Sequence, residues 1–587
     1  RYTAAGAVHN PAARNMKTCS TSFTSCTTLV AFDSATATQT ALGAASTADR
    51  DEIIAHAKGL DVKDENGNGV GGSTAASSYE NRPSMHGDVI HSQPVAINFG
   101  TQAAPKVVVF YGSNDGAFRA INGNRTDDLA TGVGPGAEVW SFMPPEFFPA
   151  LKRLRDNTTQ VKFPNVTATT ATAKDYGVDG PVSAHVTSSS AWVYAGLRRG
   201  GRALYAFNVN TTDPTQISLK WKVGCPNLAN DTGCTTGGGF DGMGQTWSAP
   251  KPITAPGYSG TLLVMGGGYD KCEDSDPHTC TASTKGKYVY VMDADTGSLL
   301  KTFTTVRGVI ADIAVARDVT TNVAKFLYIA DLGGNVFRVD VRSGAPSSWT
   351  MVKIASLGCA DVNSCTNNRK FMFRPDVLEY GGEFIVMLGS GDREKPLDYS
   401  SPSVVNSIGN RFFMLRDRPD DATWLTTETT NCTQAVMCLN SLVAMTYNGA
   451  TPSTADLAAK KGWAMMLRTK EQVVTTSITI FGTVTYSTHQ PQAPVAGQCT
   501  SNLGQARVYN QNYATGAPTK VNRSEDLPPV GLPPSPVAGM VTLDNGKTVP
   551  FCIGCDPTSP LEASQPPLPA SATPSEPKRR VYWFIER

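Results

Sequence analysis

One stretch of the chain has the residue types and the spacing of a calcium-binding loop. The candidate ligands in "DVKDENGNGVGG" are Asp61, Asp64, Asn66, Asn68 and the backbone carbonyl of Val70. Asp64, Asn66 and Asn68 stand at alternate positions before Gly69, and a loop with this spacing can surround Ca²⁺ with oxygen donors. Position twelve is Ala75, so the bidentate acid that completes this kind of loop is missing. A solvated Gly/Asn turn is the alternative interpretation.

A second set of oxygen donors is a weaker metal candidate. Asp318, Thr320 and Asn322 also alternate, but Val323 stands where a glycine would be needed. A plain turn between two strands explains this pattern as well.

Few other residues suggest catalysis. Asp392, Arg393 and Glu394 in "GSGDREKP" form a charge cluster, which we interpret as surface ion pairs at the rim of a sheet rather than a catalytic group. His86 and His91 are five positions apart, so on an extended chain they point to opposite faces and do not suit a shared metal. No GxSxG turn or P-loop is present in the sequence. We therefore predict a protein without enzymatic activity.

Twelve of the 13 cysteines fall into close pairs within polar segments. The predicted disulfides are Cys19 with Cys26, Cys225 with Cys234, Cys272 with Cys280, Cys359 with Cys365, Cys432 with Cys438, and Cys552 with Cys555. Loops of this kind bury too little surface to hold themselves, and short covalent links predict an oxidising compartment. Zinc is the alternative for "CIGC", although four ligands are not found nearby. Cys499 is left over and could instead pair with Cys552 or Cys555.

Composition indicates an exported, mainly β protein. The 587 residues include 54 glycines and 38 prolines, which suit many short strands and turns. A net charge of +1 argues against a nucleic-acid partner. No apolar run approaches the roughly 18 residues that span a bilayer, and we expect a processed portion of a secreted protein.

A repeated hairpin gives the fold class. An apolar strand, a glycine turn and an alternating strand closed by Asn or Asp begin near residues 111, 194, 265, 328, 388 and 486. Gly116, Gly201, Gly286 and Gly334 are predicted to take positive φ at the reversals, and Asn122, Asp293 and Asp340 to bond the next turn with their side chains. One such unit leaves an apolar face exposed, so the repeats predict a modified β-propeller of about seven blades with inserted loops.

The predicted organisation has four parts. Residues 1–80 form a small N-terminal segment that is partly α-helical and partly irregular, with one helix from Ser46 and the candidate calcium loop. Residues 81–516 form the propeller, and 517–577 are a Pro-rich linker or insertion. Residues 578–587, "KRRVYWFIER", are a C-terminal strand that closes the last blade and removes an exposed sheet edge.

Several landmarks, in order along the chain, resemble one family. They are "RPSMHGDVIHSQPV", "YGSNDGAFRAIN", "GAEVWSFMPPEFFPAL", "YGVDGPV", "GQTWSAPKP", "YIADLGGNVFRVDV", "GSGDREKPL" and "RRVYWFIE". Together they resemble the PilC/PilY family of tip-associated adhesins and biogenesis factors of type IV pili. The resemblance implies a seven-bladed propeller at the pilus tip or outer cell surface, reached through the periplasm. It also implies binding to minor pilins, attachment to host or surface ligands, and calcium-dependent control of pilus extension and retraction.

One departure from the family pattern affects these expectations. Family members often carry a DxDxDGxxD calcium loop before the strand near Phe326, where this chain has only "DVTTNVAKF". Acidic loops like the one at Asp61 also occur in the family, which favours that site. The alternative function is a periplasmic quinoprotein-like oxidoreductase that uses pyrroloquinoline quinone (PQQ), but the adjacent Cys-Cys pair common in such enzymes is absent from the sequence.

Overall fold

The computed structural model describes most of the chain. The described residues are 14–19, 22–69, 80–162, 169–235, 239–275, 279–280, 283–359, 368–397, 409–493, 502–528, 531–542 and 548–555. Val70, Cys365, Cys499 and the predicted strand at 578–587 lie outside them.

Blade 1 is a six-stranded sheet with the order β2-β1-β6-β5-β4-β3. Its strands are β1 (Met16–Thr18), β2 (Val30–Ala31), β3 (Val95–Asn98), β4 (Val107–Gly112), β5 (Phe118–Asn122) and β6 (Glu138–Met143). Strand β1 pairs in parallel with β6, so part of the segment predicted as a separate N-terminal region, 1–80, is built into the first blade.

Blades 2, 3 and 4 are four-stranded antiparallel sheets. Blade 2 holds β7 (Val182–Val186), β8 (Ala191–Gly196), β9 (Arg202–Val209) and β10 (Ile217–Cys225). Blade 3 holds β11 (Lys251–Ile253), β12 (Leu262–Gly266), β13 (Tyr288–Asp293) and β14 (Leu299–Thr304). Blade 4 holds β15 (Ala314–Arg317), β16 (Ala324–Ala330), β17 (Asn335–Asp340) and β18 (Met351–Ser356).

Blades 5 and 6 have five strands each, and a two-stranded sheet follows them. Blade 5 holds β19 (Asp376–Tyr380), β20 (Glu383–Gly389), β21 (Arg411–Asp417), β22 (Val443–Thr446) and β23 (Gly462–Met466). Blade 6 holds β24 (Gln472–Val473), β25 (Ile478–Ile480), β26 (Thr483–Gln490), β27 (Gln505–Asn512) and β28 (Ser524–Asp526), and the hairpin is β29 (Val537–Thr542) with β30 (Thr548–Ile553). Strand β28 lies in the segment predicted as a linker, 517–577, and extends blade 6.

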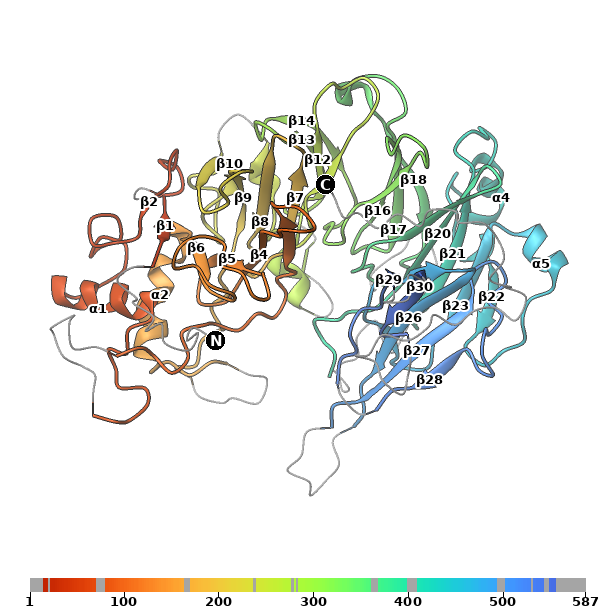
Figure 1. Ribbon diagram of the computed structural model, residues 1–587. Helices are drawn as coiled ribbons and strands as arrows, with labels where there is room; N and C mark the ends of the chain where they lie inside the picture. Colours follow the sequence, from red (N-terminus) through yellow and green to blue (C-terminus); the bar gives the residue numbers. More distant parts are fainter. Residues whose placement is uncertain are drawn as a thin grey trace.

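The α-helices are few and lie outside the sheets (Figure 1). Those in the described residues are α1 (Thr47–Lys58), α2 (Phe148–Asp156), α4 (Thr429–Cys432) and α5 (Thr454–Ala459). Ser46 caps α1 by accepting a hydrogen bond from the Asp49 backbone, as its sequence predicts. Ile53 and Ile54 of this helix pack with α2 against β1 and β6 of blade 1.

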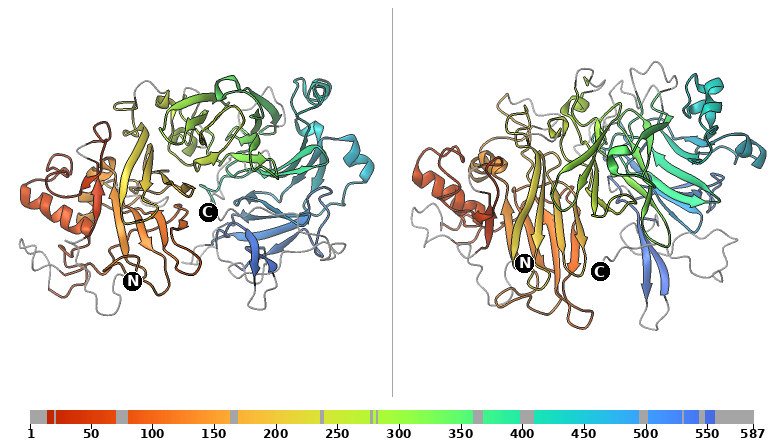
Figure 2. Two further views of the ribbon diagram at one scale, coloured as in Figure 1. Left: turned by 45° about the horizontal axis from the view of Figure 1, so that its top comes forward. Right: turned by 90° about the horizontal axis from the view of Figure 1, so that it is seen from above.

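The blades follow one another in chain order around an arc (Figure 2). Five clusters of buried apolar side chains lie between successive blades, from blades 1 and 2 to blades 5 and 6. Strand β12 shows the principle, because Leu263 and Met265 pack toward blade 2 whereas Leu262 and Val264 pack toward blade 4. Each inner blade therefore buries both faces against its neighbours, as expected for a β-propeller.

The repeated hairpin of the sequence forms two neighbouring central strands in each of the six blades. These pairs are β4–β5, β8–β9, β12–β13, β16–β17, β20–β21 and β26–β27. The closing residues act as predicted: Asn122, Asp293 and Asp340 each accept a hydrogen bond from a backbone N–H within the next three residues. Three of the four turn glycines have positive φ, with values of 96° at Gly116, 76° at Gly286 and 75° at Gly334.

The prediction for the fourth turn glycine, Gly201, is wrong. In this turn Arg198 takes the left-handed conformation, with a φ of 49°. Gly201 instead lies so close to the side chain of Leu197 that a Cβ would overlap it. Arg198 and Arg199 thus occupy the reversal of this turn, where the other three hairpins have a glycine with positive φ.

Candidate functional site

One end of the propeller, named here the hairpin face, collects the turns of the repeated hairpins. In an antiparallel blade the turn between strands two and three lies at the same end as the connection to the next blade. Within the described residues the hairpin face therefore comprises the turns at 113–117, 197–201 and 331–334 and the connection at 305–313. It also includes 267–275, 279–280 and 283–287 between β12 and β13, 357–359 and 368–375 between blades 4 and 5, and the loop at 390–397. The charged loop residues that the sequence singled out, Asp392 to Glu394, belong to this face.

An ion-pair cluster crosses the hairpin face from blade 5 to blade 2. Oε1 of Glu394 lies 3.0 Å from Nη2 of Arg198, and its Oε2 lies 2.7 Å from Nη2 and 3.0 Å from Nε of Arg199. The side chains of Glu394 and Arg198 are only 15% and 12% exposed. The predicted ion pairs are present, but these groups are largely buried and join two blades rather than lying on the surface of one.

Aromatic rings support the two arginines. The guanidinium of Arg198 lies 3.8 Å from the centre of the Trp247 ring, and that of Arg199 lies 5.0 Å from it. Trp247 stacks on Tyr269 with ring centres 4.3 Å apart. The hydroxyl of Tyr269 donates to Asp274, which also pairs with Arg199 at 3.3 Å. Blades 2, 3 and 5 thus meet in one polar and aromatic cluster.

A second cluster connects blades 3, 4 and 5. The ammonium of Lys370 lies 2.9 Å from Asp392 and 3.6 Å from Glu273, while Glu273 accepts hydrogen bonds from the guanidinium of Arg307. Burial alone would lower the pKa of Lys370, but Asp392 and Glu273 raise it above its usual value. Arg307 also donates to Asn368 at 3.1 Å. These contacts hold the connections between blades in fixed positions.

The two histidines have separate partners. The ring of His86 stacks on Tyr111 and its Nε2 lies 2.7 Å from the Tyr111 hydroxyl. The Nδ1 of His91 lies 2.7 Å from Asp179 instead. Each histidine therefore contacts a different side chain.

Disulfides close five of the loops that the sequence predicts. The structure contains the predicted bonds Cys19–Cys26, Cys225–Cys234, Cys272–Cys280, Cys432–Cys438 and Cys552–Cys555. Cys359 is also disulfide-bonded, and Cys365, its predicted partner, lies outside the described residues.

Three of these loops, Cys19–Cys26, Cys225–Cys234 and Cys272–Cys280, adjoin one another and are named here the stapled row. A Cβ on Gly233 would lie 3.3 Å from Thr24 of the first loop. Asp231 of the second loop pairs at 2.7 Å with Lys285, which follows the third.

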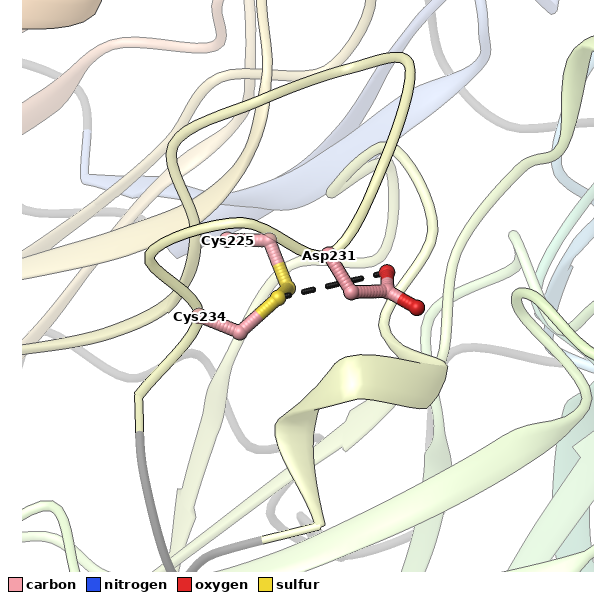
Figure 3. Close-up of side chains that lie close together, drawn as sticks. All are labelled: Cys225, Asp231 and Cys234. Atoms are coloured by element: carbon pink, nitrogen blue, oxygen red, sulfur yellow. Dashed lines mark hydrogen bonds between the residues drawn. A yellow bond between two sulfur atoms is a disulfide. The ribbon is translucent and has the colours of Figure 1, made fainter.

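The group Cys225, Asp231 and Cys234 has the geometry of a metal site without its chemistry (Figure 3). The two sulfur atoms are bonded to each other, so neither is a free thiolate that could bind a cation. Asp231 pairs with Arg202 at 2.9 Å and with Lys285. This group is a structural element of the stapled row.

The candidate calcium loop brings together part of the predicted ligand set. The backbone N–H of Asn68 donates to Asp64 at 2.9 Å and to Oδ1 of Asn66 at 3.0 Å. Asp61 is buried away from them and accepts hydrogen bonds from the backbone of Glu65 with both oxygens. Asp64, Asn66 and Asn68 therefore form the cluster, whereas Asp61 shapes the start of the loop.

Sequence reasoning missed Glu80, which faces this cluster from the far side of the loop. Its Oε1 accepts hydrogen bonds from the side-chain amides of Asn66 at 2.5 Å and of Asn68 at 2.8 Å. Glu80 thus adds a carboxylate to the cluster, and turning each amide over would present its oxygen in place of its N–H group. The usual loop spacing could not have revealed it, because Glu80 lies 16 positions after Asp64, beyond the twelve residues that such a loop spans.

The weaker candidate at Asp318, Thr320 and Asn322 lies at the opposite end of the blades, in the turn between β15 and β16. Oδ1 of Asp318 accepts the backbone N–H groups of Thr320 at 3.0 Å and of Thr321 at 2.9 Å. Asn322 has a φ of 61° and closes the turn. Metal binding here stays a prediction.

Comparison with known families identifies the fold. Residues 89–370 match the family model of the PilY1 beta-propeller domain. The chain contains a PilY1 propeller. This match agrees with the resemblance that the sequence shows to the PilC/PilY family. A search of curated proteins gave no match.

Solved structures resemble the chain only distantly. The C-terminal domain of PilY1 from Pseudomonas aeruginosa is 16% identical with a TM-score of 0.47, over 76% of this chain and 90% of that one. A quinohemoprotein alcohol dehydrogenase from Pseudomonas putida is 12% identical with a TM-score of 0.35, over 76% of this chain and 60% of that one. BamB from Moraxella catarrhalis is 10% identical with a TM-score of 0.28, over 73% of this chain and 91% of that one. In the described part of the chain, no helix has the length and apolar character to cross a membrane.

Proposed function

We propose that this chain is a non-enzymatic interaction platform of the type IV pilus tip, exported through the periplasm to the outer surface. Its partners are the minor pilins of the tip complex, and as an adhesin it also contacts host or surface ligands. The PilY1 propeller supports the pilus assignment. The observation that carries the platform is the stapled row, since covalently closed loops on a rigid scaffold are a common form of binding surface.

Binding of purified minor pilins to loop variants tests this proposal. Replacing residues 227–232 by a Gly/Ser segment keeps both cysteines and should weaken pilin binding at least tenfold. The control replaces residues 319–322 at the opposite end of the blades and should leave binding unchanged. Equal binding by both variants and the original chain would contradict a contact through the stapled row.

We also propose that calcium regulates the platform through Asp64, Asn66, Asn68 and Glu80. A hard cation favours such oxygen donors, and the observed hydrogen bonds already draw these side chains together. In calorimetric titration with Ca²⁺, the changes Asp64→Ala and Glu80→Gln should each weaken binding at least tenfold. Asp318→Ala should bind like the unchanged chain, and an effect confined to that variant would move the site to the second loop.

A further inference from the structure

Arg198 and Arg199 converge on one carboxylate although they are adjacent in the sequence. Neighbouring side chains usually diverge, and here the positive φ of Arg198, 49°, turns both guanidiniums to the same side. A left-handed conformation at a residue other than glycine is strained, and such strain is concentrated at functional sites. Together the arginines bind both oxygens of Glu394 through three hydrogen bonds.

The surroundings of the pair match those of carboxylate receptors. Arginine presents a planar fork that suits a carboxylate, and an aromatic face strengthens the site. Trp247 provides this floor at 3.8 Å from Arg198, and Tyr269 holds Trp247 from below by stacking. Both arginines and both rings come from turns or connections tied to strands of blades 2 and 3, so the receptor part is rigid.

The carboxylate, by contrast, comes from another blade on a loop. Residues 390–397 leave β20 and cross toward blade 2, and only Glu394 among them pairs with the two arginines. The other acids near the pair are placed less well, with Asp179 3.7 Å from Nη1 of Arg198 and exposed Asp274 3.3 Å from Arg199. That Nη1 is buried and makes no hydrogen bond within the part of the chain described. If Glu394 left this position, the two positive charges of Arg198 and Arg199 would remain, together with Nη1 of Arg198 as a donor without a hydrogen bond.

We propose that Arg198, Arg199 and Trp247 form a carboxylate-binding site for an acidic segment of a protein partner, and that Glu394 holds this site until the partner takes its place. When a carboxylate of the partner replaces Glu394, the arginines keep the same number of hydrogen bonds. The free energy of this exchange is therefore set by the movement of the loop at 390–397 away from the arginines. The inference rests on the proposed platform function and names the chemistry of one of its contacts.

Binding of a hexaglutamate peptide to the full chain tests the site, with hexaglutamine as the uncharged control peptide. Glu394→Ala should bind hexaglutamate at least tenfold more tightly than the unchanged chain, and 0.5 M NaCl should remove most of the gain. Adding Arg199→Gln to Glu394→Ala should abolish the gain. Glu383→Ala is the matched control, since Glu383 pairs with Arg416 within blade 5, and it should bind like the unchanged chain.

The outcomes separate this inference from the platform itself. Circular dichroism confirms that each variant is folded before binding is measured. If folded Glu394→Ala binds hexaglutamate no better than the unchanged chain, Glu394 is only a structural link between blades 2 and 5 and the inference is overturned. Loss of pilin binding in the 227–232 variant would still support the platform in that case.

Discussion

Glu146 offers a sharp test of how burial controls stability in this propeller. It lies between β6 and α2, where both of its carboxylate oxygens accept hydrogen bonds from the hydroxyl of Tyr205 at 2.7 Å. Phe23 of the first disulfide loop packs edge-on against the same tyrosine ring. Burial raises the pKa of Glu146 from 4.5 to about 7, although the Tyr205 hydrogen bond works in the opposite direction.

The sign of the effect follows from linkage. The unfolded chain loses the Glu146 proton near pH 4.5, whereas the folded chain keeps it to about pH 7. The free energy of unfolding is therefore unaffected below pH 4.5, falls as the pH rises toward 7, and is constant above it. From pH 5 to pH 8 the loss is about 2.5 kcal/mol, at about 1.4 kcal/mol for each unit of pKa difference.

Glu146→Gln removes this titration. A chain of 587 residues unfolds with an entropy of about 1.2 kcal/mol/K. The Tm of the variant minus the Tm of the original chain should therefore be about 2 °C larger at pH 8 than at pH 5. Calorimetric scans at four pH values measure the gap. Glu383→Gln is the control, because Arg416 and Arg418 lower the pKa of Glu383 and its gap should stay constant over this range. A constant gap for Glu146→Gln as well would refute the argument.

Three further predictions concern packing, chain closure and activity. Gly266→Ala should lower stability by about 1–3 kcal/mol in denaturant melts, because its Cβ would overlap the backbone carbonyl of Val309, while Gly134→Ala should change it by less than about 0.5 kcal/mol. Equal effects would show that the blades do not depend on this close approach. Deleting residues 579–587 should lower the Tm sharply if the terminal strand completes the last blade, and an unchanged melt would argue against that closure. Reconstitution with PQQ and Ca²⁺ should give no dye-linked oxidation, and turnover would support the oxidoreductase alternative instead.

The fold was predictable because each blade repeats one local pattern. Turn glycines such as Gly116 and closing residues such as Asn122 act within a few positions of the chain, where sequence spacing equals spatial proximity. The turn at Gly201 broke the rule because Arg198 took the strained conformation in its place. Conformational propensity favours glycine at a position with positive φ. The contacts of Arg198 with Trp247 and Glu394 explain why an arginine takes this conformation here.

The candidate sites were less predictable because they depend on contacts between distant segments. Glu394 lies 196 positions after Arg198, and nothing in the local sequence of either residue indicates the other. Glu80 escaped notice for the same reason, although it lies much closer to its loop. By contrast, five disulfides followed from spacing alone, because each joins cysteines at most nine positions apart.

The apolar layers between blades have a consequence for how the molecule loses its structure. Each layer is shared by two consecutive sheets only, so every blade is supported by the one before and the one after it. The blades therefore resemble the units of a repeat protein, in which each unit is stabilised by its neighbours and unfolding proceeds inward from an end. Hydrogen exchange should therefore be slowest at β12, β13, β16 and β17 in the middle of the row, and damage to a terminal blade should leave those strands protected.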